Sequence, residues 1–128
     1  MISAVQQAVY QKLTGDATLM GLVTGIYDEV PPGTEPPYVV IEGIDSTADD
    51  SLDAPGLALR ISLHVWSKAA GWLESERIAQ RIYELLHRQP LAVTGWAHVG
   101  TWLVDQQMLR DGELRHLVSD YRIEIRQP

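Results

Sequence analysis

The sequence contains no cysteine among its 128 residues. This absence excludes a disulfide framework and any metal site built on thiolates, and it fits synthesis in a reducing cytoplasm. The chain also lacks a run of about 18 apolar residues, which a membrane-spanning helix requires. Its first residues lack the basic and apolar regions of a signal peptide. We therefore expect no membrane partner.

Positive charge is scarce as well. Ten Lys and Arg stand against 17 Asp and Glu, which gives a net charge of −7. Nucleic-acid binding draws on clustered Lys and Arg side chains, so the chain is a poor general binder of DNA or RNA. We attribute the charge to solubility. The length and the 45% hydrophobic content suffice for one domain over residues 1–128 with its own core.

Sequence motifs of known chemistry are missing. The four histidines, His64, His87, His98 and His116, do not show the spacing of metal ligands. There is no Gly-x-Ser-x-Gly elbow and no glycine-rich phosphate loop, and the aspartates of residues 45–53 lack the pattern of a calcium loop. We expect no catalytic residue, no cofactor and no metal. A Ser-His-Asp triad, which is set by geometry rather than by sequence order, stays open.

The N-terminal region predicts a helix followed by a shorter helical segment. Ser3 and Gln6 have the spacing of a capping box, which marks a helix start, and Gly15 suits its C-terminal stop. Asp16 can cap the second segment, which Gly25 ends. The apolar residues that share one face are Val5, Val9 and Leu13 in the first helix, and Leu19, Leu22 and Val23 in the second segment.

A second main helix is expected over residues 72–88. Its apolar residues recur at helical spacing and predict a buried face. Glu84 and Arg88 are spaced as a supporting ion pair, and Pro90 stops the helix. The buried face consists of Ile78, Ile82, Leu85 and Leu86.

Strands are expected over residues 26–28, 38–44, 57–66, 96–110 and 114–126. Residues 57–66 alternate between an apolar face and a second face, and Asp111-Gly112 signals a hairpin. The order of helix, strands, helix, strands predicts an α+β fold with a mainly antiparallel sheet and two main helices packed on one face. In the last strand we expect Leu117, Tyr121, Ile123 and Ile125 to face inward and His116, Asp120, Arg122, Glu124 and Arg126 to face outward.

Two loops and one strand face are candidate contact surfaces. The prolines of residues 31–37 pre-set an extended path, and residues 44–56 are predicted to form a long acidic loop, a kind that is often functional. Core packing is the default for the four tryptophans, but Trp66 has the outward phase of a subunit contact. The candidate interface residues are Pro31, Pro32, Pro36, Pro37, Asp45, Asp49, Asp50, Asp53, Trp66, Arg122, Glu124 and Arg126.

Several short motifs follow one another along nearly the whole chain. Residues 13–25 read Leu-Thr-Gly-Asp-Ala-Thr-Leu-Met-Gly-Leu-Val-Thr-Gly, residues 25–28 read Gly-Ile-Tyr-Asp, and residues 37–41 read Pro-Tyr-Val-Val-Ile. Leu-His-Val-Trp-Ser at residues 63–67 directly precedes a helix, and Leu-Arg-Asp-Gly at residues 109–112 leads into the final strand. In this order the chain resembles the tail completion, or tail terminator, proteins of long-tailed bacteriophages and prophages.

The resemblance implies structural work rather than chemistry. Such proteins form a ring, usually of six copies, on the end of a finished tail tube, where the ring ends tube polymerisation and presents a surface to the head. The implied partners are other copies of the chain, the tail tube protein and a head connector or head-closure protein, with DNA only in passage. The implied location is the virion tail, after synthesis in the cytoplasm of the bacterial host.

Two alternatives stay open. One is another head-tail connector or head-closure component, which shares partners with a terminator but occupies a different position in the particle. The other is a small ligand-binding or enzymatic α+β domain. A defined higher oligomer favours the first class, and a monomer with a deep polar pocket favours the second.

Overall fold

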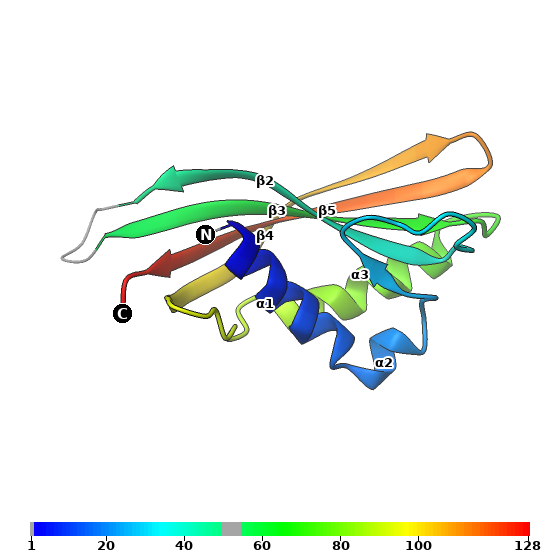
Figure 1. Ribbon diagram of the computed structural model, residues 1–128. Coiled ribbons are helices and arrows are strands. Elements are labelled where there is room, and N and C mark those ends of the chain that lie inside the picture. Colours follow the sequence, from blue (N-terminus) through cyan, green and yellow to red (C-terminus); the bar gives the residue numbers. More distant parts are fainter. Residues whose placement is uncertain (1, 50–54) are drawn as a thin grey trace.

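The computed structural model describes residues 2–49 and 55–128. Within these ranges the chain forms three helices and five strands in the order α1 (Ile2–Thr14), α2 (Ala17–Met20), β1 (Ile26–Tyr27), β2 (Tyr38–Ala48), β3 (Gly56–Ser67), α3 (Leu73–Leu86), β4 (Ala97–Asp111) and β5 (Leu114–Arg126). Figure 1 shows one long twisted sheet with the helices drawn below it. The α+β class predicted from the sequence is confirmed.

The sheet has the strand order β1-β2-β3-β5-β4. β1 pairs in parallel with β2, and the other neighbouring strands are antiparallel, so the prediction of a mainly antiparallel sheet is confirmed. β4 lies at one edge of the sheet. The other edge is β2 itself wherever the two residues of β1 do not cover it.

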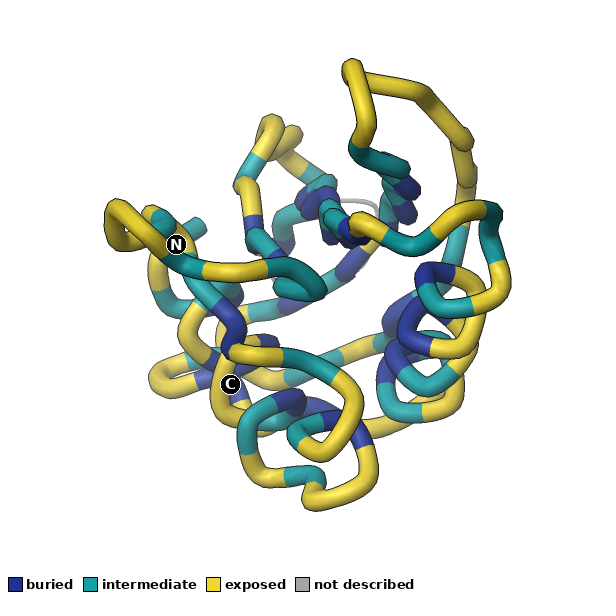
Figure 2. The backbone as a smooth tube through the Cα atoms, turned by 90° about the vertical axis from the view of Figure 1, so that its right-hand side faces the viewer, coloured by how far each residue is buried: buried dark blue, intermediate teal, exposed yellow. Residues whose placement is uncertain are grey.

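Buried side chains of α1, α3, β3 and β5 form one apolar cluster. The inward faces predicted for α1, β3 and β5 are buried, apart from half-buried Leu57, and Leu85 of α3 is likewise only half-buried. Each fully buried Val, Leu or Ile side chain contributes about 1.5–3 kcal/mol relative to its exposed state. Figure 2 shows exposed segments in the loops at the rim and buried segments in the interior.

Two predictions about the N-terminal helices are wrong. Ser3 lies inside α1, and the side-chain amide of Gln6 donates to the carbonyl oxygen of Ile41 at 3.1 Å, so these two residues do not form a capping box. A contact with the neighbouring strand has replaced the local one. α2 ends at Met20 and leaves Leu22 exposed, so the second segment is shorter than predicted.

The predicted cap of α2 is confirmed, whereas the predicted ion pair of α3 is wrong. Asp16 accepts a hydrogen bond from the backbone N–H of Leu19 at 2.8 Å and binds the guanidinium of Arg81 at 2.7 and 2.9 Å. α3 ends at Leu86, two residues before Arg88, whose φ of 56° is left-handed. Arg88 therefore leaves the helical face of Glu84, and Glu84 instead lies 3.6 Å from Arg81.

The described part of the predicted acidic loop, residues 44–49, 55 and 56, is mostly strand. Residues 45–48 of β2 pair with residues 57–60 of β3 after a bulge at Ile44, and the backbone N–H of Asp49 donates to Gly56 at 2.8 Å. The prediction rested on the polarity of the side chains, but the long β3 strand offers backbone partners whatever those side chains are. Asp50 and Asp53 lie outside the described residues.

β4 and β5 form the predicted hairpin, with the turn one residue later than expected. Asp111 pairs with Leu114, so Gly112 and Glu113 form a two-residue loop. Gly112 has a φ of 62°, a left-handed value that suits glycine, whereas the φ of Glu113 is not positive. This is the pattern of a type II′ turn, whose backbone matches the twist of the flanking strands.

Candidate assembly surface

Alternate residues of β2, β3 and β5 make the second face of the sheet, which is polar. Asp120 accepts from Nε and Nη2 of Arg60 at 3.0 and 2.6 Å, and it also accepts from the hydroxyl of Ser62. The hydrogen bond and charge of Asp120 raise the pKa of Arg60 above its usual value. Because these contacts join β3 to β5, they hold this face in a defined register.

Two histidines, a tryptophan and a glutamate form a row across the same face. Nδ1 of His64 and Nε2 of His116 lie 2.7 Å apart, and Nε2 of His64 lies 3.3 Å from Oε1 of Glu42. The ring of His116 stacks on Trp66, with centroids 3.8 Å apart and planes at 12°. In this contact one imidazole donates a hydrogen bond and the other accepts it. Burial, together with the charge of His64, lowers the pKa of His116, and Asp111 opposes this.

Sequence reasoning treated these histidines separately and missed the row. The outward phases of Trp66 and His116 were both predicted from alternation. Their contact depends on the strand pairing, which places Trp66 opposite His116. The register between two strands that lie 50 residues apart in sequence cannot be predicted from the pattern of either strand alone. The row makes Trp66 part of a stacked cluster, and its predicted role as a subunit contact stays a prediction.

A histidine also contacts a hydroxyl group, at a buried position. Nε2 of His98 lies 2.8 Å from Oγ1 of Thr101, and Nδ1 of His98 accepts from the backbone N–H of Leu91 at 3.2 Å. Thr101 has no exposed surface, so its hydroxyl cannot meet a substrate. Burial lowers the pKa of His98. This arrangement joins the segment after α3 to β4 and serves the fold.

The proline segment, residues 31–37, is tied to its neighbours by hydrogen bonds. The backbone N–H of Thr24 donates to the carbonyl oxygen of Pro37 at 2.8 Å, and its hydroxyl donates to that of Glu35 at 2.7 Å. The carboxylate of Glu35 pairs with Lys68 in the turn after β3, and the peptide bond between Pro36 and Pro37 is cis. Pro31 and Pro32 are exposed, whereas Pro36 and Pro37 are half-buried, so this well-anchored segment presents its first two prolines to solvent.

The charged candidates gather at the opposite end of β2 and β3. Arg122 and Glu124 form an ion pair at 2.6 Å, and Nη1 of Arg126 donates to the carbonyl oxygen of Asp49 at 2.7 Å. Asp45, Asp49 and Arg122 line a shallow hollow of about 390 Å³. The prediction that Arg126 faces outward as part of a row needs correction, because its side chain is engaged with Asp49 and mostly buried.

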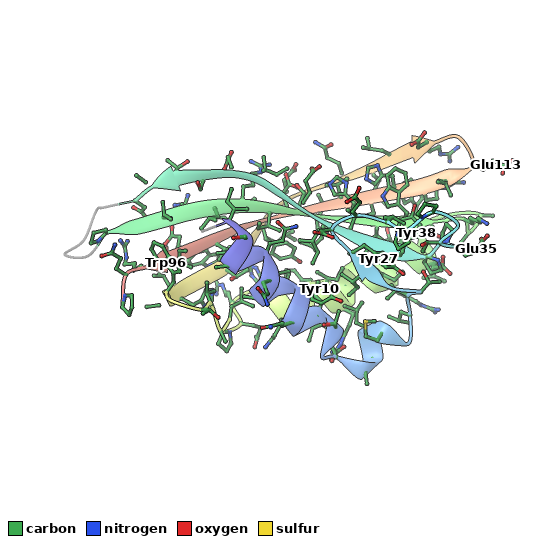
Figure 3. All side chains as sticks on the ribbon, viewed as in Figure 1. Tyr10, Tyr27, Glu35, Tyr38, Trp96 and Glu113 are labelled. Carbon is green, nitrogen blue, oxygen red and sulfur yellow. The ribbon has the colours of Figure 1, made fainter. Side chains whose placement is uncertain are left out.

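The sequence-predicted interface residues therefore do not form one site. Along β3, Trp66 lies six positions from Arg60, the register partner of Arg122, which is about 20 Å of strand. Figure 3 shows Glu35 of the proline segment near the end of the molecule that carries Glu113, and Trp96 toward the other end. Trp66 pairs with Tyr38 beside the proline segment, and the charged candidates lie toward the other end. The role of these surfaces in assembly stays a prediction.

Sequence reasoning also missed an arm made by residues 104–118. All of residues 104–113 are exposed, and they include three large apolar side chains, Val104, Met108 and Leu109. Met108 lines a hollow of about 810 Å³ together with Leu22 and Leu73, which are also exposed. The Asp111-Gly112 signal predicts the hairpin, but the length of hairpin that extends beyond the core depends on where the helices end.

No group of His, Asp and Glu in residues 2–49 and 55–128 is arranged to hold a metal ion. Within the same residues, no helix is long and apolar enough to cross a membrane.

Comparison with known proteins gives a family match along nearly the whole chain. Residues 7–126 match the family model described as tail completion protein gp17. Tail completion protein gp17 of Bacillus phage SPP1 is 30% identical over 125 residues, which cover 95% of this chain and 92% of that protein.

Two solved structures share the fold. A chain in the virion of a native gene transfer agent particle superposes with a TM-score of 0.89 and 28% identity, covering 97% of this chain and 96% of that one. The structure of bacteriophage SPP1 gp17 protein superposes with a TM-score of 0.68 and 26% identity, covering 95% of this chain and 88% of that one.

Proposed function

The chain belongs to the tail completion protein gp17 family, and from this premise we propose that it caps the tail tube of a phage as a ring. It is a structural protein of the virion tail. In the proposed role, the ring ends tube polymerisation and joins the tail to the head. Residues 1–128 act in it as one domain, without catalysis and without a cofactor.

The observation that carries this proposal is the likeness to a subunit of an assembled particle. The match to the gene transfer agent virion chain, with a TM-score of 0.89, extends over 97% of this chain. A structural role needs shape and contact surfaces, and these are the features the chain has. In the proposed ring the two main helices cover one face of the sheet, and the polar second face meets a tail or head partner.

A deletion of the gene in its phage tests the position in assembly. Tube subunits that add head to tail form a contact that does not close on itself, so a cap is needed to end growth. We expect lysates with filled heads and separate tails, some of them longer than normal, in electron micrographs. Joined particles of normal tail length would contradict the proposal. Complete absence of tails would assign the protein to an earlier step.

Native mass spectrometry with and without purified tail tubes tests the ring itself. Six copies is the number we propose for the ring, and free chains are expected to be monomeric until a tube end is present. A protein that remains monomeric and never binds tubes would exclude the capping role. The partners proposed at the ring are the tail tube protein and a head connector or head-closure protein.

Arg122→Glu tests whether the polar face docks to a partner. Arg122 is half exposed, and among the described residues its side chain forms an ion pair with Glu124 alone, so its reversal should leave the fold intact. We expect weaker head joining with unchanged thermal stability. Lys12→Glu, in the last turn of α1 away from this face, is the matched control. Equal joining by both variants would remove Arg122 from the docking surface.

A further inference from the structure

The outer edge of the arm has open backbone groups. Asp111 and Leu114 flank a two-residue turn and are therefore a hydrogen-bonded pair. Antiparallel pairs alternate between bonded and non-bonded positions, so the N–H and C=O groups of Arg110, Met108 and Gln106 point away from β5. No described residue forms a backbone hydrogen bond with these groups. Residues 106–110 thus form a template for one more strand.

The middle of the same edge is covered by the chain itself. The backbone N–H of Arg88 donates to the carbonyl oxygen of Thr101 at 2.7 Å, and the backbone N–H of Leu103 donates to Nδ1 of His87 at 3.1 Å. An added strand is therefore excluded between Thr101 and Leu103 and finds room along the arm.

The opposite edge of the sheet has a second open stretch. β1 covers β2 at Val39, and the side chain of Gln6 covers it at Ile41. Since the N–H of Asp49 turns toward β3, alternation leaves the backbone groups of Ser46 and Ala48 pointing outward. This second open edge, residues 43–48, is similar in length to the arm edge.

Each open edge begins at a bulge whose extra residue is β-branched and apolar. Ile44 has no register partner on β3, and Val104 has none on β5. Their side chains are 46% and 49% exposed. Bulges often re-aim a side chain or blunt an edge, and a polar residue would serve solubility better. The exposed apolar side chains of Ile44 and Val104 therefore favour a contact in which a partner buries them.

Charge distinguishes the two edges. Every charged residue from 13 to 59 is Asp or Glu, so the β1–β2 side of the sheet carries carboxylates and no cation of its own sequence. The β4 side carries Arg77, Arg88 and Arg110, which form no ion pair with any described residue, alongside acidic residues of its own. Two β2 edges would repel each other. The arginines of the β4 side that form no ion pair with a described residue therefore offer the acidic β2 edge a partner on another copy.

We propose that the arm edge of one copy, residues 106–110, pairs with the β2 edge of the next copy, residues 43–48, and so extends one sheet from subunit to subunit. This contact rests on the ring proposed above. It joins two unlike surfaces on opposite sides of the chain, which is the condition for a ring rather than a two-fold dimer. Main-chain hydrogen bonds supply the pairing, and Ile44 and Val104 lose their exposure there.

Cysteine cross-linking tests the pairing without background, because the chain has no cysteine. Ser46→Cys, Met108→Cys and the double variant are assembled on tail tubes of the same phage and treated with a short bis-maleimide. We expect the double variant to give a ladder that ends at the ring size, the mixture of single variants to give dimers only, and each single variant alone to give no cross-link. Dimers of Met108→Cys alone would show a β4–β4 contact and overturn the proposal.

A proline substitution tests the role of the backbone. Met108→Pro removes an N–H that points away from β5 and leaves the β4–β5 bonds in place, a position where edge strands accept proline. Met108→Ala shortens the same side chain and keeps the N–H. We expect the proline variant to lose ring formation about tenfold or more relative to the alanine variant, with equal thermal unfolding. Equal ring yields in the two folded variants would overturn the proposal.

Electron micrographs of the same samples separate this contact from the proposed function. If tails are capped by rings while the Ser46 and Met108 cysteines never cross-link, the capping role holds and the edge contact is wrong. If no ring binds the tubes of the wild-type protein, the capping role itself fails.

Discussion

Replacing Tyr121 by Phe should stabilise the protein. Tyr121 on β5 has no exposed surface, and its hydroxyl has no hydrogen-bond partner among the described residues. Burial and the nearby Tyr83 raise the pKa of Tyr121 well above its usual value. A buried hydroxyl without a partner costs about 1–3 kcal/mol in mutational data. The ring of Phe fills the same space, so the packing of the core is kept.

Part of that cost is already offset by relaxation, so we expect a gain of about 1 kcal/mol in the free energy of unfolding. For a chain of this size the gain corresponds to a rise of about 3–5 °C in Tm. Urea unfolding followed by circular dichroism should show a higher midpoint with an unchanged slope. Calorimetry of the same variant checks the shift in Tm.

Thr101→Val is the matched comparison, because it removes a buried hydroxyl that does have a partner. The change leaves Nε2 of His98 without the Thr101 contact and should cost about 1–3 kcal/mol. The two variants are thus expected to move in opposite directions. A clear loss of stability in Tyr121→Phe would refute the reasoning, since it would mean that the hydroxyl contributes a favourable interaction.

Three further predictions concern titration and the turn. The pKa of His116 beside His64 is lowered, so near and below the ordinary value of 6.5 the unfolded chain binds more protons than the folded chain. The stability should therefore fall as pH drops from 7.5 to 5.5. His116→Gln should flatten this dependence in thermal unfolding. The pKa of Asp16 is lowered to about 2, chiefly by Arg81; its contribution is present above 3.8 and is lost as pH falls toward 2, so Asp16→Ala should destabilise at pH 7 and have little effect at pH 2. Gly112→Val places a β-branched residue at a φ of 62° and should cost about 1–2 kcal/mol, with faster amide exchange in the arm and none of this effect in α1.

The parts of the fold that sequence could predict are those set by local periodicity. Alternation in residues 57–66 identified β3 and its buried face, because burial on one side imposes a period of two. Asp16 as a cap needed only the residues that follow it. The hairpin came from the Asp-Gly pair, although the turn itself is formed by Gly112 and Glu113.

The predictions are wrong where a contact with a residue distant in sequence determines the local structure. Gln6 bonds to β2 instead of capping its own helix, and residues 45–48 are strand because β3 lies beside them. The row of His64, His116 and Trp66 depends on register across strands, which no single strand encodes. Loop composition and strand phase indicate candidate interface residues one by one, but they do not show that the proline segment and the charged residues lie toward opposite ends of the molecule.

If two copies pair as proposed, the cover that His87 and Arg88 place over the middle of β4 limits the length of backbone that they can share. In the proposed ring each junction has only a short stretch of backbone to share, so an isolated pair of chains dissociates readily at cellular dilution. A tube end that seats copies side by side raises their effective concentration, and every junction then reinforces the others. For the proposed ring we therefore expect cooperative closure, with few partial rings on the tube and few sheets of free copies in the cell.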